Sequence, residues 1–363
     1  MEYMHTRKRT ESSPSINHKR THSTTPTTPS DQKPRKLKSI RYQGPHYLRR
    51  LAAKNSYAQK FKLGVTDESK RLCQALLDGT QLVPKESLFD DDIFDRTCDK
   101  LEGKNEARVI QDISRLIVPS AEQLSRRAQH LECLTESVNE GWNNSIPLVG
   151  PRPQPDYSVG FGREAFSKDQ LAKMSPFIGD LINGQSLFLA TFDMHFPFLT
   201  CESKCGEGEL EIADRQNTHS MTLAARSVVE LFRMVKRECE LHRQILAFSI
   251  SHDHRSLRIY GHYPVMDGKD TKYYRYPIRQ FDFTEQGGRD KWTVYRFTKN
   301  VCDMWMPQHF ERICSAVDQL PSELEFSVPP LSQATGLSQG LGSCDLSQPG
   351  SDHVSMPVDQ DSQ

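Results

Sequence analysis

The chain has 363 residues, enough for one large domain or two small ones. Lys and Arg together number 47, as do Asp and Glu, and no stretch approaches the about 18 consecutive apolar residues of a membrane span. The nine cysteines are scattered and the N-terminus lacks a secretory apolar run, so no disulfide framework is expected. These features argue against a membrane protein and favour a reduced compartment, nuclear or cytoplasmic.

Charge is distributed unevenly between the two ends of the chain. Residues 1–40 are rich in Ser, Thr, Pro, Lys and Arg, which predicts a disordered basic arm. Its basic clusters favour the nucleus, as an import signal or a phosphate-binding arm, although a solubilising tail explains them equally well. No Lys or Arg follows Arg312, and residues 321–363 are predicted to be a disordered acidic tail.

The first half of the chain has mainly helical patterns. Residues 41–100 are expected to form a helical lead-in, followed by a domain over 101–320. In residues 104–118 the apolar positions, Ala107 among them, recur at helical spacing. Pro119 ends that helix, and Ser120 is expected to begin another that runs to about Glu136.

Strand-like runs alternate with helical patterns further along. The longest helix is expected over 210–236, where apolar residues form a broad stripe. Ser167 is expected to cap a helix that runs to about Leu181. Strands are expected over 156–161, 186–192, 196–205, 245–251, 257–263 and 273–283, and two helices split by Pro307 over 290–306 and 308–320.

An acid and a lysine lie two residues apart where the run 196–205 ends. Successive side chains of a strand point to opposite faces, so Glu202 and Lys204 are expected on one face, about 6.6 Å apart along the strand. Asp156 begins the strand-like run 156–161. If these two strands pair, all three side chains meet at one edge of a sheet.

This arrangement resembles the PD-(D/E)xK nuclease superfamily, which has the restriction-endonuclease-like fold. The residues that carry the likeness are Pro-Gln-Pro-Asp-Tyr-Ser-Val-Gly-Phe at 153–161 and Phe-Pro-Phe-Leu-Thr-Cys-Glu-Ser-Lys at 196–204, with the helix that follows. The wider stretch is similar to a fungal domain family of uncharacterised function within that superfamily. The resemblance implies an α/β domain with a central mixed sheet flanked by helices.

The resemblance also implies roles for individual residues. Asp156 and Glu202, with the main-chain carbonyl of Ser203, would bind Mg²⁺ or Mn²⁺, and Lys204 would position the attacking water. Glu106, in the helix before the first motif strand, is the candidate fourth carboxylate; a solvent-facing helix Glu is the alternative. Gln216, on the long helix, is the candidate polar residue near the scissile phosphate. Nucleases of this kind are frequently homodimers.

Other features keep a second hypothesis open. Acid-x-Lys triplets occur elsewhere in this chain, for example at Asp267 and Asp270, where solvated charge pairs explain them. In the superfamily the residue between acid and lysine is more often apolar, whereas here it is Ser203, a buried hydroxyl that needs a partner. The chain is therefore expected to be either a metal-dependent nuclease acting on DNA or RNA, or a catalytically inactive module of the same fold that binds nucleic acid or protein.

Tyrosines and basic residues alternate between 258 and 279, which is compatible with two kinds of surface. They include Tyr260 and Tyr263 with Arg258 and Arg275. Such a set can stack bases and bind phosphates. A cross-strand cluster that only stabilises the sheet explains the same residues at least as well.

Overall fold

The structure, a computed structural model, describes residues 42–44, 46–178, 185–205, 209–268 and 270–321. The basic arm expected over 1–40 lies outside the described residues, as does the acidic tail except for Pro321. The elements described below belong to one unit that ends at Leu320.

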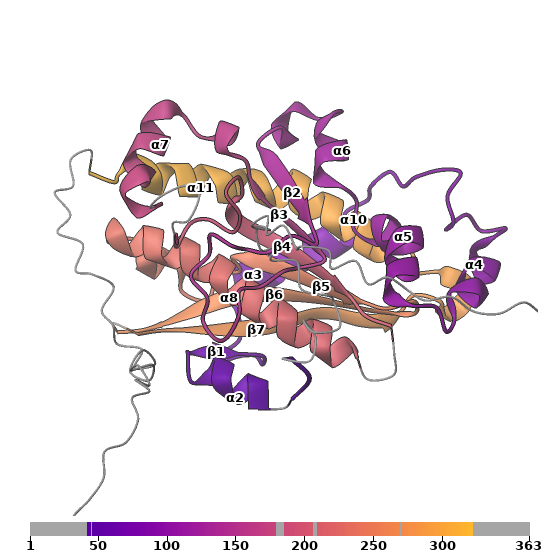
Figure 1. The fold of residues 1–363 in the computed structure, drawn as a ribbon. Coiled ribbons are helices and arrows are strands. Elements are labelled where there is room, and N and C mark those ends of the chain that lie inside the picture. Colours follow the sequence, from indigo (N-terminus) through magenta and orange to yellow (C-terminus); the bar gives the residue numbers. More distant parts are fainter. Residues whose placement is uncertain (1–41, 45, 179–184, 206–208, 269, 322–363) are drawn as a thin grey trace, which may run out of the picture. The chain divides into compact units, whose positions relative to one another are not determined.

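A mixed β-sheet runs through the centre of this unit (Figure 1). The described residues contribute seven strands, in the spatial order β1-β7-β6-β5-β4-β3-β2. Pairs β4–β5 and β1–β7 are parallel and the remaining neighbours are antiparallel. The strands are β1 (Ser56–Tyr57), β2 (Leu134–Val138), β3 (Tyr157–Phe161), β4 (His195–Ser203), β5 (Ala247–His252), β6 (Ser256–Asp267) and β7 (Asp270–Asp282).

Helices flank this sheet, which gives the α/β class that the sequence predicts. The helices are α2 (His46–Ala52), α3 (Asp67–Asp78), α4 (Phe94–Leu101), α5 (Glu106–Ile117), α6 (Ala121–Ser125), α7 (Lys168–Met174), α8 (Leu210–Met234), α9 (Glu285–Gly288), α10 (Thr293–Asn300) and α11 (Met306–Asp318). A π-helical turn, η5 (Val301–Trp305), joins the last two. In the part of the chain that is described, no helix has the length and apolar character that crossing a bilayer requires.

Helix α8 covers one face of the sheet and α10, with the π-helical turn, covers the other. Asn217 of α8 donates to the carbonyl of Ile250 and to the hydroxyl of Ser251, both at 2.9 Å. The ring of Phe248, on the opposite face of β5, lies 5.6 Å from that of Phe297 and 5.0 Å from that of Trp305. The alternation along β5 therefore separates a polar interface under α8 from an aromatic interface under α10.

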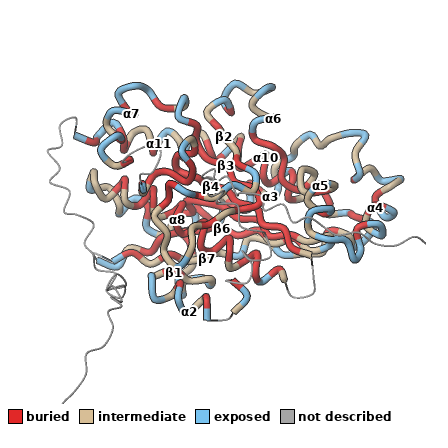
Figure 2. Tube along the Cα trace, in the orientation of Figure 1, coloured by how far each residue is buried: buried red, intermediate tan, exposed pale blue. Residues whose placement is uncertain are grey.

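Most predicted elements are confirmed. The strand-like runs 156–161, 196–205, 245–251, 257–263 and 273–283 form β3 to β7, and the long apolar stripe forms α8. Ser167 caps α7 in a capping box with Gln170, as its sequence indicates, although the helix ends at Met174 and residues 179–184 lie outside the description. Burial follows these elements, with the least exposed residues concentrated along the strands and α8 (Figure 2).

The helix expected from Ser120 to Glu136 is wrong. Helix α6 ends at Ser125, and residues 134–138 form β2, which pairs with β3. Ser120 does cap α6, but its hydroxyl also donates to the carboxylate of Glu136 at 2.8 Å and 2.9 Å, which fixes the strand beside the helix. Residues 134–138 thus form a strand because they pair with β3, although their local sequence pattern predicts a helix.

Two further expectations near the edges of the fold are wrong. Pro307 does not split two helices, because it lies in the first turn of α11, where a missing N–H costs no helical hydrogen bond. Residues 186–192 form only isolated bridges, through Ser186 and Leu189, although Phe188 is fully buried. An apolar run shows burial but does not by itself distinguish a strand from an ordered loop.

The helical lead-in expected over 41–100 contributes a strand as well as helices. β1 pairs in parallel with β7, with Ser56 beside Tyr273. The hydroxyl of Ser56 lies 2.7 Å from that of Thr222 on α8. These contacts join the lead-in to the same sheet and the same helix as the rest of the described unit.

Candidate active site

The ends of β3 and β4 bring the predicted Asp156 and Glu202 together. The antiparallel register that pairs Tyr157 with Cys201 places Asp156 alongside Glu202. Lys204 follows the last residue of β4, and its backbone N–H donates to the carbonyl of His252 at 2.9 Å, which continues the pairing with β5. The three side chains therefore sit on backbone held by sheet hydrogen bonds.

The ammonium group of Lys204 is the centre of this site. Its Nζ lies 3.4 Å from Oε1 of Glu106, 3.8 Å from Oδ2 of Asp156 and 3.9 Å from Oε2 of Glu202. It also donates to the carbonyl of Ser203 at 2.8 Å. Lys204 is 5% exposed, Asp156 7% and Glu202 1%. The structure thus brings Lys204 and three of the other four predicted site residues together, with all three carboxylates within 4 Å of its Nζ.

Glu106 reaches the site from the first turn of α5. Asn105 caps this helix, its side-chain oxygen accepting the N–H of Arg108 at 3.0 Å. The buried stripe is Val109, Ile113 and Ile117, so the expectation that Ala107 lies on it is wrong, and Ala107 is exposed. Glu106 is half-buried because it precedes Val109 by three residues and so lies on the same side of the helix.

Acidic side chains outnumber basic ones among the groups within 4 Å of the Lys204 ammonium. Burial lowers the pKa of Lys204, but the carboxylates of Asp156, Glu202 and Glu106 raise it by more, so its pKa lies above the usual value and the group stays charged. One ammonium then faces three carboxylates. Carboxylate oxygens of this kind are ligands that hard divalent cations prefer.

A hard divalent cation fits this donor set. Asp156 and Glu202 supply carboxylate oxygens from adjacent strands, and Mg²⁺ commonly binds one or two carboxylates while it keeps several waters. Among the described residues, no three His, Cys, Asp or Glu side chains form a metal site by themselves. A bound Mg²⁺ would therefore depend on water or a substrate oxygen for its remaining ligands.

The structure does not connect Gln216 with the other predicted site residues through a hydrogen bond. Gln216 is 4% exposed on α8, and its Oε1 has no hydrogen-bond partner in the described part of the chain. Its neighbour Asn217 instead holds α8 to the sheet, since it also accepts the hydroxyl of Thr200 at 2.6 Å. Asn217 thereby links α8 to β4 two residues before Glu202.

Ser203 is buried, as its place in the strand predicts, and its hydroxyl lacks the partner that a buried hydroxyl needs. The residue is 1% exposed, and its Oγ makes no hydrogen bond within the described residues. Its backbone does contribute, because the N–H of Ser203 donates to Oδ2 of Asp156 at 3.0 Å.

Ser203→Ala is expected to raise the free energy of unfolding by about 1 kcal/mol, because it removes a buried hydroxyl and keeps the backbone contact to Asp156. Urea unfolding of both proteins measures this difference. Thr200→Ala is the matched comparison from the same strand, since the hydroxyl of Thr200 is hydrogen-bonded to Asn217, and this variant should lose stability. A loss of stability in Ser203→Ala as large as that in Thr200→Ala would show that the hydroxyl of Ser203 has a partner.

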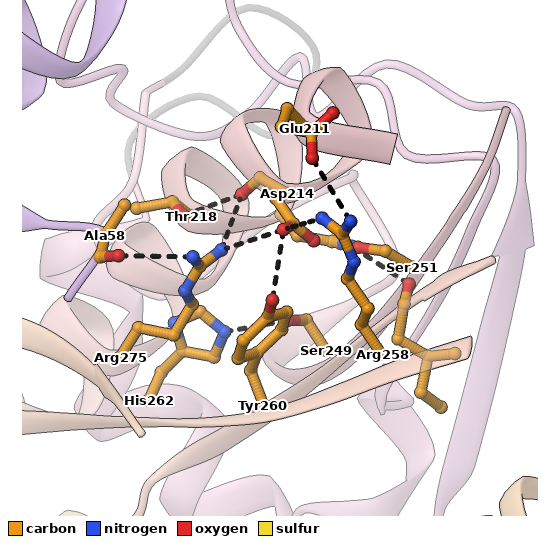
Figure 3. A network of polar contacts seen from close by, with 12 residues as sticks. Ala58, Glu211, Asp214, Thr218, Ser249, Ser251, Arg258, Tyr260, His262 and Arg275 are labelled. Atoms are coloured by element: carbon orange, nitrogen blue, oxygen red, sulfur yellow. Dashed lines mark hydrogen bonds and ion pairs between the residues drawn. The ribbon is translucent and has the colours of Figure 1, made fainter. Parts of the chain in front are cut away.

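Arg258 and Tyr260 of β6 and Arg275 of β7 point to a carboxylate that the sequence analysis did not select (Figure 3). Oδ2 of Asp214, on α8, accepts from Arg258 at 2.8 Å and from the hydroxyl of Tyr260 at 3.0 Å. The guanidinium of Arg275 lies 3.7 Å from the same oxygen and 3.9 Å from the centre of the Tyr260 ring. These contacts favour the structural explanation for this part of the cluster. In the sequence, Asp214 looks like any polar residue of a helix.

The comparisons with known proteins give one match. A family model described as a domain of unknown function (DUF7924) matches residues 93–317. No curated protein and no solved structure matches the chain. The matched region runs from α4 to α11, so it contains Glu106, Asp156, Glu202 and Lys204 and most of the sheet. Because the match covers more than half of the 363 residues, the chain belongs to the DUF7924 family.

Proposed function

We propose that this protein is a metal-dependent nuclease of the PD-(D/E)xK type, which hydrolyses phosphodiester bonds in DNA or RNA. The observation that carries the proposal is the position of Lys204, whose ammonium lies within 4 Å of Asp156, Glu202 and Glu106. Groups that a nuclease of this type needs come from three elements far apart in the sequence. The other acid-x-Lys triplets within the described residues lack this setting; Lys272, for example, pairs with the exposed Asp267.

The order of elements supports a restriction-endonuclease-like fold. A helix with a carboxylate (α5) precedes a strand that directly follows the Pro-Asp pair (β3). A strand that ends one residue before Lys204 (β4) and a long helix (α8) come after it. This is the order that the resemblance implies. The strand β2 before β3 and the strand β5 parallel to β4 complete a mixed sheet around the site.

In the proposed reaction the residues have separate roles. Asp156 and Glu202 hold the metal ion, which when bound would neutralise phosphate charge and lower the pKa of a coordinated water. Lys204 donates to the attacking water and stabilises negative charge that develops on the phosphate. Glu106 keeps the ammonium of Lys204 at the rim of the site through its 3.4 Å contact.

Cleavage of labelled single- and double-stranded DNA and RNA tests this function, with Mg²⁺, with Mn²⁺ and with chelator. Asp156→Asn is the sharpest variant, because it removes the charge and keeps an oxygen that can accept the N–H of Ser203. Lys204→Met removes the ammonium and keeps the aliphatic stem. Lys272→Met is the matched control, since it removes the lysine of an exposed acid-x-Lys triplet.

We expect metal-dependent cleavage by the wild type and by Lys272→Met. Asp156→Asn and Lys204→Met should each lose at least about 100-fold in rate, the scale of a lost electrostatic or acid–base contribution. Circular dichroism must show that each variant is folded. Absence of cleavage by the wild type on all four substrates, with nucleic-acid binding retained by every variant, would refute the nuclease and favour the inactive binding module.

A further inference from the structure

A cavity of about 400 Å³ with a mixed polar and apolar lining lies far from the candidate active site. It is formed by α3, the segment before β5, and the start of α11. Its wall includes Gln244 and Ile245, next to the first residue of β5, whereas Lys204 pairs with His252 at the other end of that strand. The two sites are therefore separated by roughly 20 Å along β5.

The guanidinium of Arg312, in the wall of this cavity, donates to a neutral side chain and not to a carboxylate. Its Nε and Nη2 point to the same neutral acceptor, Nδ1 of His309, at 3.1 Å and 2.7 Å. Burial lowers the pKa of His309 well below its usual value, so this imidazole carries no charge. In the described part of the chain, no carboxylate oxygen lies within 4.0 Å of the Arg312 guanidinium.

The surrounding groups hold Arg312 in place without neutralising it. The ring of His309 stacks on Trp305, with centroids 4.2 Å apart and planes 18° apart. Two carboxylates act on Arg312 only over a distance. Glu68, which also lines the cavity, accepts from Gln244 at 3.2 Å, and Glu240 is paired with Arg237 at 2.7 Å. A guanidinium that makes two hydrogen bonds to a neutral ring, with no carboxylate in contact, can receive an anion.

The remaining wall suits a small oxyanion on an organic molecule. Arg71 adds a second positive charge and Gln308 adds an amide group, while the hydroxyl of Ser69 donates to the side chain of Gln244 at 3.1 Å. Leu72, Ala75 and Ile245 supply an apolar side. A volume of about 400 Å³ exceeds that of one phosphate and falls within the range of small-molecule pockets.

We infer that this cavity is a binding site for a small phosphorylated molecule, whose phosphate is held by the fork of Arg312 with Arg71 beside it. His309 accepts one N–H from Nε and one from Nη2, so the N–H groups of Nη1 and the second N–H of Nη2 are left to bind two oxygens of one phosphate, which a lysine cannot do. This site does not depend on the nuclease proposal, because it shares no residue with the candidate active site.

Thermal unfolding with inorganic phosphate and with pyrophosphate tests the inference, at ionic strength matched with sodium chloride and with chelator present. At twenty times the dissociation constant, phosphate should raise the melting temperature of the wild type by about 3 °C. Each variant is compared with itself without phosphate, so a change in its own stability does not affect the result. Calorimetric titration then gives the dissociation constants.

Arg312→Gln should weaken phosphate binding at least about 10-fold, because a charge-assisted pair of hydrogen bonds is lost. Ala75→Phe, which fills the cavity and leaves Arg312 in place, should have the same effect and serves if Arg312→Gln does not fold. Arg237→Gln removes a nearby arginine that is paired outside the cavity wall, and it should bind as the wild type does. Lys204→Met should also bind normally, which excludes the candidate active site as the source of the signal.

Two results would overturn this inference. One is the absence of any response of the wild type to phosphate and to pyrophosphate. The other is an equal response in the wild type, Arg312→Gln and Ala75→Phe, which would place phosphate binding elsewhere on the protein. Either result leaves the cleavage experiment unaffected, because that experiment changes no residue of the cavity wall.

Discussion

Lys204→Met is expected to lower the free energy of unfolding by about 3–5 kcal/mol at pH 7.5 in the presence of chelator, the cost of removing one partner from a buried ion pair. The ammonium of Lys204 is the cation that the structure places between Asp156, Glu202 and Glu106, all within 4 Å. Without it, three carboxylates share one largely buried site. Urea unfolding of the wild type and the variant measures the loss.

Two comparisons show whether this loss arises from uncompensated charge. Lys272→Met removes a lysine from an exposed pair with Asp267, and it should leave stability unchanged because water screens that pair. Lys204→Met combined with Glu106→Gln should be more stable than Lys204→Met alone, since only two carboxylates then remain around the position of the lost ammonium. If Lys204→Met is as stable as the wild type, the carboxylates are not held by the lysine, and the electrostatic description of the site is wrong.

Acid is expected to destabilise the protein well before most carboxylates become protonated. Burial lowers the pKa of His195 to about 4 and that of His219 to about 3. Both values lie below the unfolded value of about 6.5, so the folded state favours the neutral form. The stability is therefore complete above pH 6.5 and is lost as pH falls towards the folded pKa values. Between pH 7 and pH 5 each histidine should cost about 2 kcal/mol.

Urea unfolding at pH 7, 6 and 5 measures this effect, and His219 offers the clearest variant. Its Nδ1 lies 3.0 Å from the hydroxyl of Tyr47 and 3.3 Å from that of Tyr42. His219→Gln, which cannot titrate, should show a smaller loss between pH 7 and pH 5 than the wild type. His46→Gln, at an exposed position, should match the wild type. A flat dependence of stability on pH between 7 and 5 would mean that these histidines are protonated when buried.

Some of the candidate site can be predicted from local sequence. The apolar run before Glu202 and the Pro-Asp pair at 155–156 each indicate a strand end, and the antiparallel register of β3 and β4 then places Asp156 beside Glu202. The alternation of a strand puts Glu202 and Lys204 on one face. Helix α8 can be predicted because its apolar residues recur at helical spacing over many turns.

The contacts between distant segments follow only from the tertiary structure. Glu106 precedes Lys204 by 98 residues, and no periodicity within α5 shows that its first turn ends beside β4. Residues 134–138 have a helical neighbour in sequence and become a strand because β3 offers them hydrogen bonds. Asp214 is recognisable only once Arg258, Tyr260 and Arg275 surround it.

What local sequence determines and what only the tertiary structure decides differ for a physical reason. The sequence by itself determines which segments bury an apolar face and where polar residues interrupt it, because hydrophobic periodicity and backbone preferences act within a few residues. It therefore determined the α/β class, the two motif strands and the long helix of this protein. Only the tertiary structure decided which charges face one another around Lys204 and which guanidinium, that of Arg312, is left beside a cavity without a carboxylate in contact, because electrostatic energy depends on distances in space and on burial.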